Sequence, residues 1–290
     1  SAATERFGVR PAGDGIWQEA AGWLSPQAVC RALLRRSGIT LHEHCGALAL
    51  QRSGDHWHVT DANGAVRAAA DTIVVAAGMG SAALLGDHLA LPLRPVRGQT
   101  TELPAAGLPA LAATYCHRGY IAPAVGGHHC IGATFAPGDA GVDLRGADHS
   151  DNLAALAEAL PDWADALLAL DVSTLGGRAA ARAATPDYLP LCGPVPALES
   201  FRACYALLAR DARQVIDAPA PALPGCYLSA GFGSRGLSYA ALAAELLASQ
   251  VCGEIPPVTR ELQRAVSPAR FPLRTLVRGE AHTSAKGNAA

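Results

Sequence analysis

Hydrophobic and polar positions in the first third of the chain follow two periods in turn. Residues 27–36 are preceded by Ser25-Pro26 and followed by Gly38, which predicts a helix with a serine cap, an early proline and a glycine stop. Beyond this helix, apolar and polar residues alternate, which predicts short strands at 39–44, 47–52 and 56–60. The Asn63-Gly64 turn predicts one further strand after it. The run 71–77 is apolar almost throughout and leads into Gly78-Met79-Gly80. This run predicts a buried strand that leads through a turn into a short helix.

The pattern changes between about residues 91 and 184. Strand-like pieces at 94–102, 119–124 and 128–135 surround one helical stretch, 152–170, which Pro161 interrupts. This arrangement predicts an antiparallel sheet with a helix laid on it. After Pro221 the sequence again predicts a strand followed by a helix, at 225–230 and 237–251, joined by a glycine loop. Helical pieces over 257–278 and a frayed tail at 280–290 follow.

The glycine loop has the letters of a dinucleotide-binding turn. Gly231-Phe232-Gly233-Ser234-Arg235-Gly236 spells G-x-G-x-x-G between a strand and a helix. Glu254 stands near the position of a ribose-binding carboxylate, but Pro256-Pro257 excludes a central parallel strand there. We therefore predict a glycine turn at a helix N-terminus, which can stabilise negative charge, without a complete βαβ unit. A tight turn that binds nothing is the alternative reading.

Composition narrows the class of protein. The 290 residues are enough for about two domains at roughly 150 residues each, and 50% of them are hydrophobic against 17% charged, which excludes a disordered chain. The net charge of −2 does not favour a general polyanion binder. No apolar run has the length of a bilayer span, and no leader pattern opens the sequence.

Cysteine and histidine spacing predicts neither disulfides nor a metal site. The eight cysteines contain no C-x-x-C pair, so we expect reduced and mostly buried thiols in a cytoplasmic protein. The pairs His42/His44 and His56/His58 lack a third ligand, so we expect them to face solvent.

An ordered set of motifs resembles the D-amino-acid oxidase superfamily of flavoproteins. Within it, the chain is similar to the C-terminal FAD-dependent oxidoreductase module of a bifunctional tRNA-modifying enzyme. The matching segments run over nearly the whole chain: 22–26 (GWLSP), 72–78 (TIVVAAG), 94–99 (RPVRGQ), 119–123 (GYIAP), 132–135 (GATF), 182–193 (RAATPDYLPLCG), 233–237 (GSRGL) and 267–271 (SPARF). The family's first glycine-rich strand–turn–helix, its ribose-binding Glu and the methyltransferase half have no counterpart before Ser25.

The resemblance implies a mixed α/β (α+β) fold with two domains. It implies an incomplete, Rossmann-like FAD-binding domain, discontinuous over 22–90 and 185–266. It also implies an antiparallel-sheet substrate domain over 1–21 and 91–184, with a C-terminal extension at 267–290.

It further implies an amine oxidation with FAD as cofactor. In the tRNA-modifying member, the carboxymethylaminomethyl group on wobble uridine loses its carboxymethyl part as glyoxylate. Arg182 falls on the position that anchors the substrate carboxylate, and Tyr120, with Arg118 close by, falls on the substrate side. The positions implied to contact the cofactor are Gly78, Arg97, Gly231, Gly233, Ser234, Arg235, Gly236 and Leu237.

Several of these assignments have a structural alternative. Arg182 could form an interdomain ion pair, Tyr120 could lie in the core, Arg97 could brace a sheet, and Gly78 could mark a close helix–sheet contact. Arginines repeat at helical spacing at 260 and 264 and at 270, 274 and 278, either as a stripe for tRNA phosphates or as a solvated face. For the whole chain, the alternatives are a free amino-acid oxidase of the glycine or sarcosine type and a fold that binds no flavin.

Overall fold

A computed structural model of the chain describes residues 2–279 and divides it into two compact units. Unit 1 is formed by Ser1–Thr40 and Pro95–Ala181, and unit 2 by Leu41–Arg94 and Arg182–Ala290. Residues 22–40, which the sequence assigned to the nucleotide-binding domain, therefore group with unit 1. The predicted tail at 280–290 lies outside the described residues.

Unit 1 is built on a six-stranded sheet with order β10-β5-β8-β7-β6, in which β9 also pairs with β5. Its strands are β5 (Arg94–Pro104), β6 (Tyr115–Cys116), β7 (Tyr120–Ile121), β8 (His128–Gly132), β9 (Ala136–Pro137) and β10 (Gly176–Ala184). The pairs β5/β8, β5/β9, β6/β7 and β7/β8 are antiparallel, as the sequence predicted.

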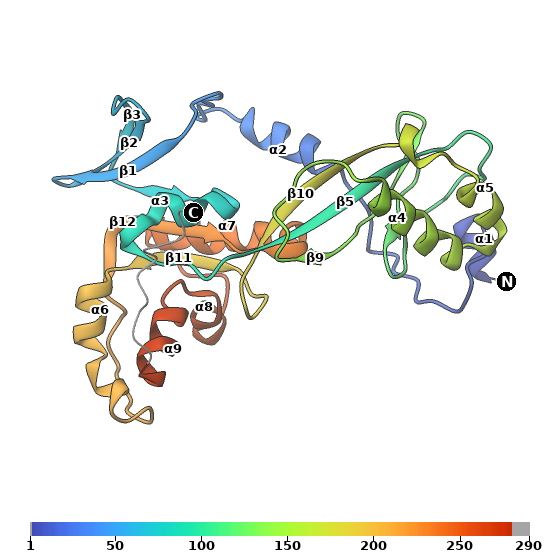
Figure 1. Cartoon of the computed structure of the whole chain (residues 1–290). Helices are drawn as coiled ribbons and strands as arrows, with labels where there is room; N and C mark the ends of the chain where they lie inside the picture. The colour runs from blue at the N-terminus through green and yellow to red at the C-terminus, as the bar shows by residue number, and fades with distance from the viewer. Residues whose placement is uncertain (1, 280–290) are drawn as a thin grey trace. The chain divides into compact units, whose positions relative to one another are not determined.

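Helices α1 (Ala2–Phe7), α4 (Gly146–Ala159) and α5 (Ala164–Leu168) lie against this sheet and contribute Phe7, Leu156 and Leu167 to its core (Figure 1). Helix α2 (Pro26–Leu34) groups with the same unit but has no buried residue. Leu103 and Ile131 of the sheet pack with Leu156 of α4 and Trp163 beside it. The predicted break at Pro161 is confirmed, because a short 3-10 turn over Pro161–Trp163 separates α4 from α5.

The cap predicted for α2 is also confirmed. Ser25 Oγ accepts a hydrogen bond from Ala28 N at 3.3 Å, and Pro26 occupies the first turn. No strand forms over residues 39–44, however, because these residues are mostly exposed and pair with no other strand among those described.

Unit 2 contains two three-stranded sheets. Strands β1 (Leu48–Ser53), β2 (His56–Asp61) and β3 (Val66–Ala70) form an antiparallel meander. The second sheet has the order β11-β12-β4, from β11 (Leu191–Pro196), β12 (Ala222–Ala230) and β4 (Ile73–Val75), and β12 runs parallel to β4.

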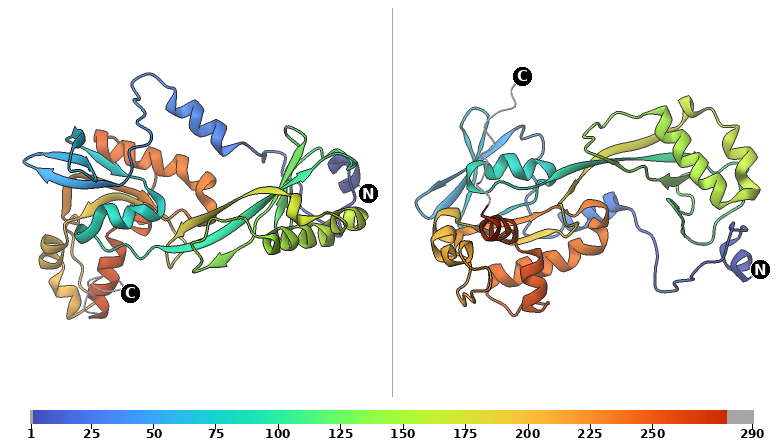
Figure 2. Two further views of the ribbon diagram at one scale, coloured as in Figure 1. Left: turned by 45° about the horizontal axis from the view of Figure 1, so that its top comes forward. Right: turned by 60° about the horizontal axis from the view of Figure 1, so that its bottom comes forward.

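Helices lie around the second sheet (Figure 2). They are α3 (Ser81–Leu85), α6 (Leu198–Cys204), α7 (Gly236–Cys252), α8 (Arg260–Val266) and α9 (Arg270–Arg278). One core cluster joins Leu191 and Leu228 of the sheet to Leu85 and Trp57. A second joins Cys192 to Leu246 and Leu247 of α7. No strand follows α7 in the described part of the chain, as the double proline predicted.

Two expectations about burial are wrong. The apolar run at 71–77 forms β4 at the edge of its sheet, where Val74 is 43% exposed and Ala76 and Ala77 are exposed. The cysteines are all unpaired, as expected, but only Cys192 and Cys226 are buried. Burial raises the pKa of each of these two thiols to about 11.

Candidate cofactor and substrate site

The predicted glycine loop of unit 2 forms a sharp corner between β12 and α7. Gly231 and Gly233 have φ values of +73° and +54°, which favour glycine. A Cβ at Gly231 would lie 2.8 Å from Thr185 Cγ2, so the corner has no room for a side chain there. Gly236 begins α7, and the first N–H groups of a helix have no intrahelical partner. The corner therefore offers backbone donors and the positive end of a 17-residue helix.

Three of the predicted cofactor residues at this corner are open to solvent. Ser234, Arg235 and Leu237 are exposed, and Arg235 donates a long hydrogen bond of 3.4 Å to Tyr239 Oη. The surface of the corner is thus accessible, whereas Gly231 beneath it is buried.

Gly78 lies at the same edge of the sheet as this corner. Val75 of β4 is in register with Leu228 of β12, and the two strands run parallel. Gly78 and Gly231 therefore each follow that register pair by three residues, where parallel strands end and where ligands of open α/β sheets bind. Gly78 has φ +56°, and a Cβ there would meet nothing within 4 Å, so the alternative of a close helix–sheet contact is wrong.

The loop after β10 packs directly against the glycine corner. Ala184 forms a bridge with Phe232, and Thr185 contacts Gly231. Arg182 is half-buried and precedes Ala184 by two residues on β10. Gly78 and the corner 231–237 thus lie at one edge of a sheet in unit 2, and Arg182 lies two residues before the bridge that joins β10 to this corner.

Tyr120 and Arg97 belong to unit 1. Tyr120 lies half-buried on β7, with its hydroxyl oxygen 3.7 Å from Cys130 Sγ. Neighbouring Arg118 has a side chain that is 67% exposed and pairs with Glu158 at 3.5 Å.

The assignment of Arg97 to the cofactor needs correction. Its side chain is completely buried and forms an ion pair with Asp148. It also donates hydrogen bonds to Gln99 Oε1 at 2.9 Å and to Asp143 O at 2.5 Å. Because its terminal donors are used inside unit 1, Arg97 braces β5 against α4, which was the alternative reading.

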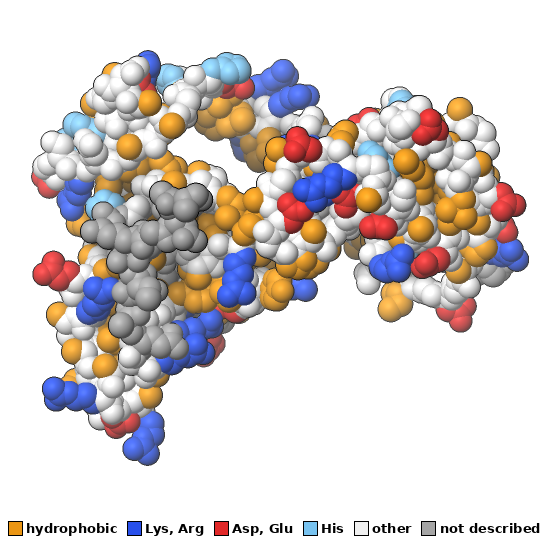
Figure 3. All heavy atoms as spheres, viewed as in Figure 1, with side chains coloured by type: hydrophobic (Ala, Val, Ile, Leu, Met, Phe, Trp, Pro, Cys, Tyr) orange, Lys and Arg blue, Asp and Glu red, His pale blue; other side chains and the backbone are white. Residues whose placement is uncertain are grey.

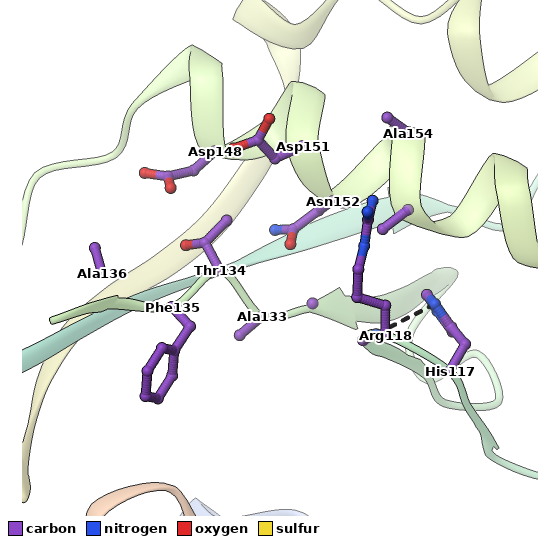
Figure 4. A pocket seen from close by; sticks show the side chains of 13 residues that line it. His117, Arg118, Ala133, Thr134, Phe135, Ala136, Asp148, Asp151, Asn152 and Ala154 are labelled. Atoms are coloured by element: carbon purple, nitrogen blue, oxygen red, sulfur yellow. Dashed lines mark hydrogen bonds between the residues drawn. The ribbon is translucent and has the colours of Figure 1, made fainter.

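Asp148 also lines a cavity of about 520 Å³ in unit 1 that the sequence did not predict. Asp148, Asp151 and Asn152 extend from α4 toward Thr134, whereas Phe135 points away from them (Figure 4). Asn152 Nδ2 donates to Gln99 O and Thr101 Oγ1, which fixes the amide. The spacing i, i+3, i+4 of the three α4 residues was the signal that could have placed them on one face.

His117 and Arg118 form the other end of this cavity (Figure 4). His117 Nδ1 accepts a hydrogen bond from Gly119 N at 3.2 Å. Burial, and then the charge of Arg118, lower the pKa of His117, so its ring is neutral near pH 7. The cavity therefore combines acceptors on α4 with one guanidinium, which favours bound groups that donate hydrogen bonds near the helix.

The geometry of unit 2 fits a flavin nucleotide. Two glycine turns meet at the carboxyl ends of parallel strands, the backbone at Gly78 is open to close approach, and the start of α7 suits a group that gains negative charge. Residues 2–279 contain no cluster of three or more His, Cys, Asp or Glu placed to hold a metal ion. No helix in that range has the length and apolarity needed to cross a bilayer.

Comparison with known proteins assigns the class. The model of the FAD dependent oxidoreductase family matches residues 1–250, and the chain belongs to that family. Its fold resembles glycine oxidase from Geobacillus kaustophilus, with a TM-score of 0.60 and 22% identity over 80% of this chain and 54% of that one. L-proline dehydrogenase from P. horikoshii gives a TM-score of 0.55 at 17% identity, over 84% of this chain and 57% of that one.

Relatives found by sequence have a higher identity to the chain than these solved structures do. The chain is 41% identical over 276 residues to the tRNA 5-methylaminomethyl-2-thiouridine biosynthesis bifunctional protein MnmC of Pseudomonas putida strain F1. It is 44% identical over 276 residues to the protein of the same name from Pseudomonas aeruginosa strain UCBPP-PA14. These matches cover 94% and 93% of this chain but only 42% and 41% of the relatives. The chain therefore spans less than half of their length.

Proposed function

We propose that this chain is the FAD-dependent oxidase part of a tRNA-modifying enzyme. Its reaction would remove the carboxymethyl group from carboxymethylaminomethyl-uridine at the wobble position of tRNA. The observation that carries the proposal is the 41–44% identity to bifunctional tRNA-modifying proteins over 93–94% of the chain. A tRNA substrate and a methyltransferase partner belong to the same proposal, as does a cytoplasmic location.

The backbone of unit 2 would hold the cofactor. When bound, FAD supplies the acceptor for a hydride from the carbon next to the substrate amine. Gly78 leaves the backbone at its strand end open to a ligand, whereas Gly231 packs against Thr185 and shapes the corner from beneath. The N–H groups at the start of α7 would stabilise negative charge that develops on a ring placed against them, and fixed donors of this kind usually make a large contribution to catalysis. The Arg235 N–H is not among them, because it donates to Phe232 O within the corner.

Arg182 would anchor the substrate. It lies two residues from the bridge between Ala184 and Phe232, so it is close to the glycine corner along the chain. A planar guanidinium suits the two oxygens of the substrate's carboxymethyl group. Such a pair would orient the carbon to be oxidised, and water would then hydrolyse the substrate imine to glyoxylate and a primary aminomethyl group. Tyr120 would line the substrate side in unit 1.

The surface of α6–α9 would contact the RNA backbone. Figure 3 has more basic than acidic side chains over this part of unit 2. Exposed arginines there are Arg202, Arg210, Arg213, Arg260, Arg264, Arg274 and Arg278. Arg270 does not belong to this surface, since it is only 7% exposed, so the predicted stripe over 270–278 is incomplete.

Glyoxylate release tests the proposal. The purified chain with added FAD is incubated with tRNA that carries carboxymethylaminomethyl-uridine, and in parallel with glycine and with sarcosine. We expect glyoxylate from the tRNA and little from the free amines. Release from the free amines alone would favour the amino-acid oxidase. Absence of any spectral change in FAD on titration with the chain would favour a fold without flavin.

A further inference from the structure

The turn that follows β10 holds a tyrosine in a conformation that favours glycine. Tyr188 has φ +58°, in the left-handed region, and its N–H donates to Thr185 O at 3.2 Å. Leu189 N donates to Asp187 Oδ1 at 3.3 Å and closes the turn. The Tyr188 residue is 61% exposed. Little packing therefore compensates the backbone strain, and strain of this kind is concentrated at binding and active sites.

A buried arginine fixes this turn from below. Arg270 of α9 is 7% exposed and donates to both carboxylate oxygens of Asp187, at 3.0 and 3.1 Å. It also donates to Leu189 O at 2.7 Å and to Pro190 O at 3.0 Å. Burial alone would raise the pKa of Asp187, but the bonds and charge of Arg270, followed by Arg274, lower it well below its usual range. The turn is thus a rigid support for the tyrosine ring.

The turn also lies beside the candidate site and next to an exposed cation. Thr185, at its start, contacts Gly231 of the glycine corner. Arg274 donates to Asp187 Oδ2 at 2.8 Å, and its side chain remains 49% exposed. Asp187, Arg270 and Arg274 together carry one net positive charge. The turn thus has an exposed aromatic residue, and a half-exposed guanidinium is bonded to the same turn. Aromatic and basic side chains together bind single-stranded nucleic acid, through base stacking and phosphate contacts.

We propose that Tyr188 is a binding residue that stacks on a nucleobase of the RNA, with Arg270 as the residue that positions it. The choice of RNA rests on the proposed function. The flavin of the proposed cofactor also has a planar ring on which Tyr188 could stack, and the experiment distinguishes stacking on the flavin from stacking on a nucleobase.

The test compares RNA binding with thermal stability in three variants of the whole chain. The probe is a synthetic RNA stem-loop with carboxymethylaminomethyl-uridine in its loop, titrated at one salt concentration because phosphate contacts depend on salt. Tyr188→Gly should weaken RNA binding roughly tenfold, since stacking contributes about that much per base. It should also raise Tm by about 1–3 °C, because relief of the left-handed strain exceeds the entropy cost of glycine. Tyr188→Phe should bind RNA within about twofold of wild type, since it keeps the ring.

His44 provides a matched control. It is another exposed non-glycine residue in the left-handed region, with φ +57°, and it lies outside the turn. His44→Gly should raise Tm in the same way and leave RNA affinity unchanged.

Three outcomes would overturn the proposal. They are unchanged RNA affinity in Tyr188→Gly, no measurable RNA binding by the wild-type chain, and a loss confined to a parallel FAD titration, which would assign the ring to the cofactor. A wild-type chain that releases no glyoxylate, but whose RNA affinity still depends on Tyr188, would contradict the proposed function and support this inference.

Discussion

Arg97 on β5 and Asp148 on α4 form an ion pair in which the arginine is completely buried and the carboxylate borders the cavity of unit 1. The pair joins the sheet to the helix that covers it and fixes one acidic group of the cavity wall. A residue from a family motif thus stabilises the fold, although its position in the motif suggested a contact with the cofactor.

Replacing Arg97 with methionine should destabilise the chain by about 3 kcal/mol, because it leaves a largely buried carboxylate without its partner. Urea-induced unfolding followed by circular dichroism measures the change, and hydrogen exchange in α4 locates it. Arg118→Met is the control, and it should cost less than about 1 kcal/mol because the Arg118–Glu158 pair is exposed. Equal effects of the two substitutions would contradict the bracing role.

Mild acid should destabilise the chain through His149. Thr101 Oγ1 lies 2.7 Å from His149 Nδ1 and already accepts from Asn152 Nδ2, so its hydroxyl is free to donate to the neutral ring. Burial lowers the pKa of His149 from 6.5, although the charge of Asp148 opposes the shift. Below pH 6.5 the unfolded chain therefore binds a proton that the folded chain excludes, and stability falls by at most about 1.4 kcal/mol per pH unit.

Unfolding experiments between pH 5 and 8 in His149→Gln should show a shallower pH dependence than in the wild type. The remaining slope should come from His117, whose pKa is also lowered by burial. The double variant with His117→Gln should be nearly flat. An unaltered slope in His149→Gln would refute this account.

Alanine at Gly231 should destabilise the glycine corner for two separable reasons. The left-handed φ costs about 1 kcal/mol for a residue with a Cβ, and the contact with Thr185 Cγ2 adds about 1–3 kcal/mol. Gly253 has nearly the same φ, +71°, with nothing within 4 Å of its Cβ position, so Gly253→Ala isolates the first cost. Thermal unfolding measures both variants.

The second cost can be removed by a second substitution. Thr185→Ser deletes Cγ2 and keeps the hydroxyl that donates to Leu189 O at 2.7 Å. When combined with Gly231→Ala, Thr185→Ser should remove most of the extra loss of stability that Gly231→Ala shows relative to Gly253→Ala. No restoration would mean that the contact is unimportant.

Arg182→Ala should reduce kcat/KM for the modified tRNA roughly 10- to 100-fold, the loss expected for hydrogen bonds to a charged group. FAD affinity, measured by flavin fluorescence, should stay within about twofold of wild type. The kcat/KM of Arg182→Lys should lie between those of the wild type and Arg182→Ala, because lysine keeps the charge but lacks the paired donors of the guanidinium. Loss of FAD binding in Arg182→Ala, or near-normal turnover, would show that Arg182 does not anchor the substrate.

Local sequence signals predicted the ends of elements that are marked by proline or by a capping residue. Ser25-Pro26 located the start of α2, Pro161 located the break after α4, and the double proline after α7 excluded a further strand. Each of these depends on backbone chemistry that acts over a few residues, which is the range that a sequence pattern records.

The same reasoning did not predict burial or contacts that depend on residues far apart in the sequence. The apolar run of β4 predicted a buried strand, but burial depends on which strands are its neighbours in the sheet. Arg97 and Arg270 are both buried, and neither could be told from a surface arginine in a chain whose cations are nearly all arginine. Their partners, Asp148 and Asp187, lie 51 and 83 residues away.

The distance between Asp187 and Arg270 also sets an order of events during synthesis. Asp187 is translated 83 residues before Arg270. Until α9 emerges from the ribosome, the carboxylate lacks the cation that compensates its burial, and the turn against the glycine corner has no clamp. The nascent chain can therefore complete this part of unit 2 only after Arg270 has been made.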